Sequence, residues 1–110
     1  NGKISGAARQ AELQQKIADM QEKMTEAQNA VEAQEFSASV GGGVVEAKVN
    51  GKKEVISIHI KPEAVDPEDV EMLQDLVVSA VNEALRQAGE AMDKSMDGIT
   101  GGLDLSKFGL

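Results

Sequence analysis

An apolar heptad stripe runs through the first third of the chain and limits the folds open to it. Its members are separated alternately by four and three residues: Leu13, Ile17, Met20, Met24, Ala27 and Val31. This spacing predicts a long amphipathic helix over about residues 8–34. At ~1.5 Å per residue the helix would be roughly 40 Å long, too long to be covered by the rest of one small chain. We therefore expect a seam that packs partly in the core and partly against another helix, as in a homodimer.

Three short alternating segments follow, at about residues 35–40, 44–49 and 53–60. Apolar residues occupy every second position, which predicts strands with one face toward the core. The core-facing residues expected are Val45, Ala47 and Val49 in one strand and Ile56, Ile58 and Ile60 in the next. Asn50-Gly51 predicts a two-residue type I′ turn, since both central residues of that turn need a positive φ. The glycines at 41–43 predict another inter-strand turn, because a strand and not a helix follows them. Together these signals predict a three-stranded antiparallel meander.

The second half of the chain predicts another long helix, over about residues 67–97. Pro62 ends the third strand, Asp66 suits the N-cap, and Pro67 suits the first helical position. A wide apolar stripe follows, and Gly98 suits the C-cap. The expected fold is one α+β domain over residues 1–97, followed at 98–110 by a glycine-rich tail that is either flexible or docked on an apolar surface.

Composition excludes several classes of function. The chain has no cysteine, which rules out disulfides, thiolate zinc sites and a thiol nucleophile, and agrees with a cytoplasmic location. Phe36 and Phe108 are the only aromatic residues, too few for the stacking platform of a single-stranded nucleic acid module. No apolar run is long enough to cross a bilayer, so we expect no membrane association.

The side chains that carry chemistry do not form a catalytic set. His59 is the only histidine, and an exposed strand position explains it better than a general base beside Ser57, because no third group orients it. The acidic residues 68–75 are explained by the helix dipole at the start of the second helix. We expect no enzymatic activity, no cofactor, no metal and no small-molecule substrate.

Charge gives conflicting indications about nucleic acid. The formal net charge is −8, whereas DNA affinity comes largely from cations that neutralise phosphates. Any DNA contact must therefore come from a local cluster of cations. Such cations occur around the hairpin turn, along the first helix and late in the second. A solvated surface is their ordinary explanation, but a twofold dimer would double any patch and set two copies at a fixed separation.

Three segments carry a resemblance to the YbaB/EbfC family of nucleoid-associated proteins: residues 20–24 (MQEKM), 41–51 (GGGVVEAKVNG) and 66–77 (DPEDVEMLQDLV). The resemblance spans about residues 11–96. It implies an intertwined homodimer with projecting helices, located in the cytoplasm on the nucleoid, that binds double-stranded DNA and acts in chromosome organisation or gene regulation. DNA contact in this family is attributed to the projecting helices, and the candidates here are Arg9, Lys16, Lys23, Arg86 and Lys94.

Two hypotheses follow from these observations. In the first, the protein is a DNA-binding homodimer that contacts mainly the phosphate backbone. In the second, it is an acidic protein-interaction or scaffold dimer without strong DNA affinity, which the net charge favours. The position of the cations in space discriminates between them.

Overall fold

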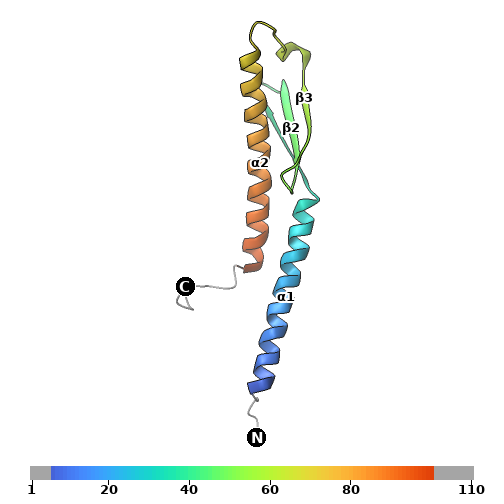
Figure 1. Cartoon of the computed structure of the whole chain (residues 1–110), viewed down its shortest axis with the longest axis vertical. Helices are drawn as coiled ribbons and strands as arrows, with labels where there is room; N and C mark the ends of the chain where they lie inside the picture. The colour runs from blue at the N-terminus through green and yellow to red at the C-terminus, as the bar shows by residue number, and fades with distance from the viewer. Residues whose placement is uncertain (1–5, 101–110) are drawn as a thin grey trace, which may run out of the picture.

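The computed structural model describes residues 6–100, which form a helix, three strands and a second helix (Figure 1). The elements, in chain order, are α1 (Gly6–Glu32), β1 (Glu35–Val40), β2 (Val45–Asn50), β3 (Val55–Ile60), the short 3-10 helix η1 (Pro62–Ala64) and α2 (Val70–Thr100). The predicted α+β order is confirmed. Neither helix over this part of the chain is apolar enough along its length to cross a bilayer.

The sheet is an antiparallel meander in the order β1-β2-β3, as predicted. α2 packs on one face of β1 and β2, and the core lies between them. The helix contributes three alanines spaced by four residues, Ala80, Ala84 and Ala88, all fully buried. Their spacing places them on one side of the helix, and their small side chains let its backbone approach the sheet closely. The sheet contributes Val45 and other small residues; the strand members of the core are Ala38, Val45, Ala47 and Val49.

α2 begins later and ends later than the sequence predicts. Pro67 lies in a turn before the helix, and the Asp69 carboxylate, not that of Asp66, accepts a hydrogen bond from the Met72 N–H at 3.2 Å. Asp66 instead accepts from the Glu68 N–H at 2.9 Å, which shapes the turn. At the other end the prediction of a Gly98 C-cap is wrong, because Gly98 lies inside the helix. The helical period continues past Gly98, so the glycine does not end it.

The turn between β2 and β3 also differs from the type I′ prediction. Its loop has three residues, from Gly51 to Lys53: the Lys53 N–H donates to the Asn50 carbonyl at 3.0 Å, and Lys53 has a φ of 65°. This is a type I turn followed by a left-handed residue. The Asn50 side chain holds the loop by accepting from the N–H groups of Lys52 and Glu54. The glycine turn at 41–43 is confirmed, with positive φ at all three residues.

Gly51 joins the hairpin to α1. Its N–H donates to the Gln34 carbonyl at 3.1 Å, and the residue is buried against the end of the helix. A Cβ placed on Gly51 would lie 1.9 Å from the Val31 carbonyl oxygen and 2.7 Å from the Glu32 Cα. Only glycine fits this approach. The hairpin therefore holds the last turn of α1 against the sheet, and Val31 is buried there.

β3 is the uncovered edge of the fold. Val49 pairs with Val55 and Lys48 with Ser57, so Ile56 forms a bulge on β3. After the bulge, isoleucines lie on the core-facing side of the sheet, but α2 packs over β1 and β2 and leaves β3 open. The exposed fractions are 49% for Val55, 48% for Ile56 and 39% for both Ile58 and Ile60. The expected direction toward the core side is confirmed for Ile58 and Ile60, which pair with Ala47 and Val45, but a single chain leaves these side chains exposed.

The predicted seam on α1 divides into two halves. Val31 is buried, Met20, Met24 and Ala27 are half-buried, and α2 runs antiparallel beside this half of the helix. Toward the N-terminus α1 continues beyond the end of α2 (Figure 1), and Leu13 and Ile17 are 58% and 49% exposed. The seam is thus a core element at one end and an unpartnered stripe at the other, within residues 6–100.

Candidate nucleic-acid interface

The cations of α1 form one line along the projecting helix. Arg9, Lys16 and Lys23 follow one another at intervals of seven residues, and all three are exposed. Seven residues make nearly two turns, so the three side chains leave the helix on the same side at steps of ~10 Å. The line borders the apolar seam, because Lys16 directly precedes Ile17 and Lys23 directly precedes Met24.

Most of this line is free to meet an anion. Lys16 lies 3.9 Å from Glu12, but both side chains are largely exposed, and such a pair is weak in water. Over residues 6–100, Arg9 and Lys23 form no ion pair. Asp19, four residues before Lys23, instead accepts a hydrogen bond from the Gln15 amide at 2.9 Å.

The cations of α2 are in a different electrostatic state. The Arg86 guanidinium donates to Glu83 at 2.7 and 2.9 Å and to Glu90 at 2.7 Å, and Lys94 lies 3.0 Å from Glu90. The hydrogen bond from Arg86 lowers the pKa of Glu83, and hydrogen bonds from Lys94 and then Arg86 lower the pKa of Glu90. Both carboxylates in turn raise the pKa of Arg86. The two acidic and two basic side chains give this cluster a net charge of zero, so it does not attract a phosphate.

The spacing of this cluster is readable in the sequence. Glu83 and Arg86 are three residues apart, and Glu90 is four residues from both Arg86 and Lys94, which are the intervals that bring helical side chains together. The sequence therefore contained a reason to rank the α2 cations below those of α1. Both candidate cations of α2 are paired with glutamates. Of the three candidate cations on α1, only Lys16 forms an ion pair with a described residue.

Among residues 6–100, four lysines lie outside the candidate set, and three of them lie in or directly after the β2–β3 hairpin. Lys52 and Lys53 are in the hairpin loop, where the Lys53 side chain runs beside Gly89 of α2, and Lys61 directly follows β3. All three are exposed and form no ion pair with the described residues. Lys48, by contrast, lies 3.7 Å from Glu35. Because Gly51 is packed on the end of α1, the loop lysines are near the base of the projecting helix.

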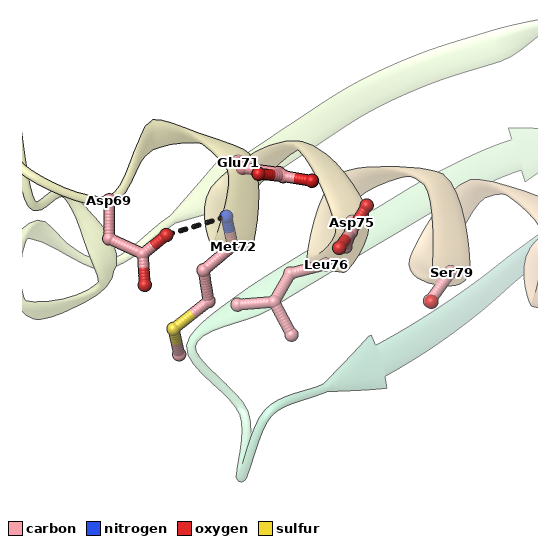
Figure 2. A pocket seen from close by; sticks show the side chains of 6 residues that line it. All are labelled: Asp69, Glu71, Met72, Asp75, Leu76 and Ser79. Atoms are coloured by element: carbon pink, nitrogen blue, oxygen red, sulfur yellow. Dashed lines mark hydrogen bonds between the residues drawn. The ribbon is translucent and has the colours of Figure 1, made fainter.

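The acidic residues at the start of α2 line a shallow hollow of about 320 Å³ (Figure 2). Figure 2 shows the Asp69 carboxylate turned toward the Met72 N–H, the capping bond that the helix start requires. The remaining lining residues are Glu71, Met72, Asp75, Leu76 and Ser79. Among residues 6–100, no three acidic or histidine side chains converge as a metal site would need. Local helix chemistry therefore accounts for this cluster.

His59 is an exposed β3 residue, and it pairs across the sheet with Glu46. Its neighbour on the same face, Ser57, pairs with Lys48. Within the described chain, no nucleophile, base and orienting group hydrogen-bond in series around His59, so its position matches the ordinary strand interpretation.

The fold is a helix, a three-stranded meander and a second helix, and the sequence profile of the YbaB/EbfC DNA-binding family matches residues 7–103. The chain belongs to this family, which confirms the resemblance of its three segments. A nucleoid-associated protein of Alkaliphilus metalliredigens is 52% identical over 102 residues, covering 93% of this chain and 90% of that protein. A nucleoid-associated protein of Clostridium acetobutylicum is 55% identical over 85 residues, covering 77% of this chain and 76% of that protein.

A solved structure has the same fold. The crystal structure of an uncharacterized protein from Helicobacter pylori superposes with a TM-score of 0.59 and 22% sequence identity. The match covers 71% of this chain and 90% of that one. At this identity the likeness supports the architecture and says nothing about the cations.

Proposed function

We propose that this protein is a nucleoid-associated homodimer that binds double-stranded DNA mainly through phosphate contacts made by α1. The single observation that carries the proposal is the line of Arg9, Lys16 and Lys23 on a projecting helix, in a chain of the YbaB/EbfC DNA-binding family. The names of its relatives place them on the nucleoid, and we extend that location, with a part in chromosome organisation or gene regulation, to this chain.

The dimer is proposed from the uncovered face of β3. An exposed edge strand with a row of unpaired N–H and C=O groups and apolar side chains associates readily with another chain. Here Ile58 and Ile60 lie on the core side of the sheet without a helix over them, and Val65, Val70 and Val78 add exposed apolar side chains in the following segments. A second copy packed on β3 would bury this surface and place two α1 helices in one particle.

The α1 line suits a phosphate backbone better than base readout. Duplex DNA carries one negative charge per ~1.7 Å of its axis, so each cation of a line with steps of ~10 Å can lie close to a phosphate. Phosphate contacts carry no sequence information, so we expect similar affinity for unrelated duplexes. Because the whole chain is acidic, the cations of α1 act locally, and binding weakens steeply as salt rises.

The test is fluorescence anisotropy of a labelled duplex across a salt series. Replacing Arg9, Lys16 and Lys23 with glutamine should reduce affinity for every duplex. It should also flatten the log–log salt slope by ~0.9 for each phosphate that the protein no longer neutralises, up to ~5 for a dimer that uses both lines. The matched control replaces Arg86 and Lys94 with glutamine, and its slope should stay near that of the parent. If the control flattens the slope and the α1 variant does not, the DNA interface is on α2.

The scaffold function is the alternative, favoured by the net charge of −8 and by the self-compensated cluster on α2. In that case an acidic surface recruits a basic partner, and DNA contact is incidental. A folded dimer that fails to bind any duplex even at low salt would favour the scaffold and end the DNA proposal.

A further inference from the structure

An apolar groove runs along the α1 seam from the exposed Leu13 and Ile17 to the half-buried Met20 and Met24. Leu13, Ile17, Met20 and Met24 line a hollow of about 470 Å³, with Lys16 and Gln21 at its rim. Its walls are almost entirely apolar, although it lies on a helix that projects from the fold. Patches of this kind on a soluble chain are normally covered. Leu13 and Ile17 are 58% and 49% exposed, so no described segment covers this end of the groove.

We propose that residues 101–110 of the same chain bind along this groove. α2 runs antiparallel to α1 and ends beside it, so that Ile99 lines one hollow together with Met20. The chain therefore continues from the point where the covered half of the seam meets the exposed half. Leu13 and Ile17 precede Met20 on α1, and α1 continues in that direction beyond the end of α2 (Figure 1).

The following segment has the reach and the composition that the groove requires. Gly101-Gly102 lets the chain leave the helix axis in any direction, and residues 103–110 (LDLSKFGL) then supply four large apolar side chains: Leu103, Leu105, Phe108 and Leu110. An extended chain spans ~3.3 Å per residue, so this segment reaches up to roughly 26 Å. The groove from Met20 to Leu13 needs only ~10 Å. One of the two aromatic residues of the protein would thus lie in this apolar groove.

A second copy of α1 is a poorer occupant, for electrostatic reasons. In the heptad, the positions on one side of the seam hold Arg9, Lys16 and Lys23, and those on the other side hold glutamines. A parallel pair of α1 helices would match cations with glutamines and gain no ion pairs, whereas an antiparallel pair would bring cations against cations. A short segment with one acid, Asp104, and one base, Lys107, meets neither problem. The bound segment would leave the line of α1 cations exposed at the edge of the groove. The proposal therefore holds whether or not these cations bind DNA.

The test uses the full chain, whose lack of cysteine allows a single spin label. A nitroxide on Ser106→Cys should remove more than half of the methyl signal of Ile17, Met20 and Met24, while the methyl signals of Ile58 and Ile60 stay unchanged. Adding Leu105→Ser and Phe108→Ser to the labelled chain should restore the affected signals. If the α1 methyl signals stay unchanged with the label in place, the groove is not occupied by this segment and the proposal is wrong.

A mixed sample separates binding within one chain from exchange between copies. Isotope-labelled chains without the nitroxide are refolded together with unlabelled chains that carry it. Binding within one chain predicts full methyl signals in the mixture. Weakened signals there would overturn the proposal and assign the groove to the tail of a second copy.

Discussion

The contact between Gly51 and the end of α1 predicts a large effect from a single methyl group. In Gly51→Ala the new Cβ would meet the Val31 carbonyl at 1.9 Å and the Glu32 Cα at 2.7 Å. All of these atoms are backbone, so no side chain can rotate away, and either the hairpin or the last turn of α1 must shift. The shift also strains the hydrogen bond from the Gly51 N–H to the Gln34 carbonyl.

The magnitude follows from these two effects. Overpacking in a tight site costs about 1–3 kcal/mol, and breaking a buried hydrogen bond costs about 1 kcal/mol more. We therefore expect Gly51→Ala to lower the free energy of unfolding by about 2–4 kcal/mol. The assay is urea denaturation at one fixed protein concentration, because dimerisation makes stability depend on concentration. Hydrogen exchange should accelerate most in the last turns of α1, where Val31 becomes less buried.

Gly89→Ala is the matched control. Gly89 also lies beside the hairpin loop, but its new Cβ would be 3.8 Å from the Lys53 side chain, an ordinary contact. Since glycine inside a helix is less stable than alanine by about 0.5–1 kcal/mol, this variant should be slightly more stable than the parent. If Gly51→Ala unfolds at the same urea concentration as the parent, the hairpin is not held tightly on α1 and the reasoning fails.

Three other predictions concern a cap, an interface and an ion-pair cluster. Asp69→Ala removes the N-cap of α2 and should cost about 1 kcal/mol in urea denaturation, and an unchanged midpoint would show that the cap is not used. Ile58→Gln should raise the dimer dissociation constant about 30-fold, or about 2 kcal/mol over two copies, in analytical ultracentrifugation. Ser57→Gln, on the opposite face, is its control, and equal effects would remove the β3 face from the interface. Arg86→Gln removes the partner that lowers the pKa of Glu83, so the stabilisation is present above the ordinary glutamate pKa and is lost as pH falls below it. Melting temperatures of parent and Arg86→Gln should therefore differ most near neutral pH and converge once acidification has protonated Glu83, and a constant difference would contradict this account.

Signals that depend on local spacing were sufficient for most of the fold. The heptad stripe predicted α1, alternation predicted the strands, and the glycines at 41–43 predicted their turn. Errors arose where two local signals competed. Asp66 and Asp69 are both good caps before an apolar stripe, and Asn50-Gly51 is compatible with two hairpin loops. The choice of loop depends on the approach of Gly51 to α1, which no local pattern records.

The candidate site shows the same division. The sequence determines that Arg9, Lys16 and Lys23 share one side of a helix, since a period of seven residues is enough for that. It also contains the intervals that pair Arg86 with glutamates, although charge counting alone does not separate paired from unpaired cations.

Only the tertiary structure decides which apolar surfaces are covered. The alternation of β3 predicts an apolar face, and α2 lies over β1 and β2 instead because Ala80, Ala84 and Ala88 fit closely against those strands. In the same way, the heptad stripe predicts a seam over its whole length, but α2 ends beside Met20 and leaves Leu13 and Ile17 exposed. Periodicity determines which side of an element is apolar, whereas the lengths and close approaches of distant elements determine how far along it that side is buried.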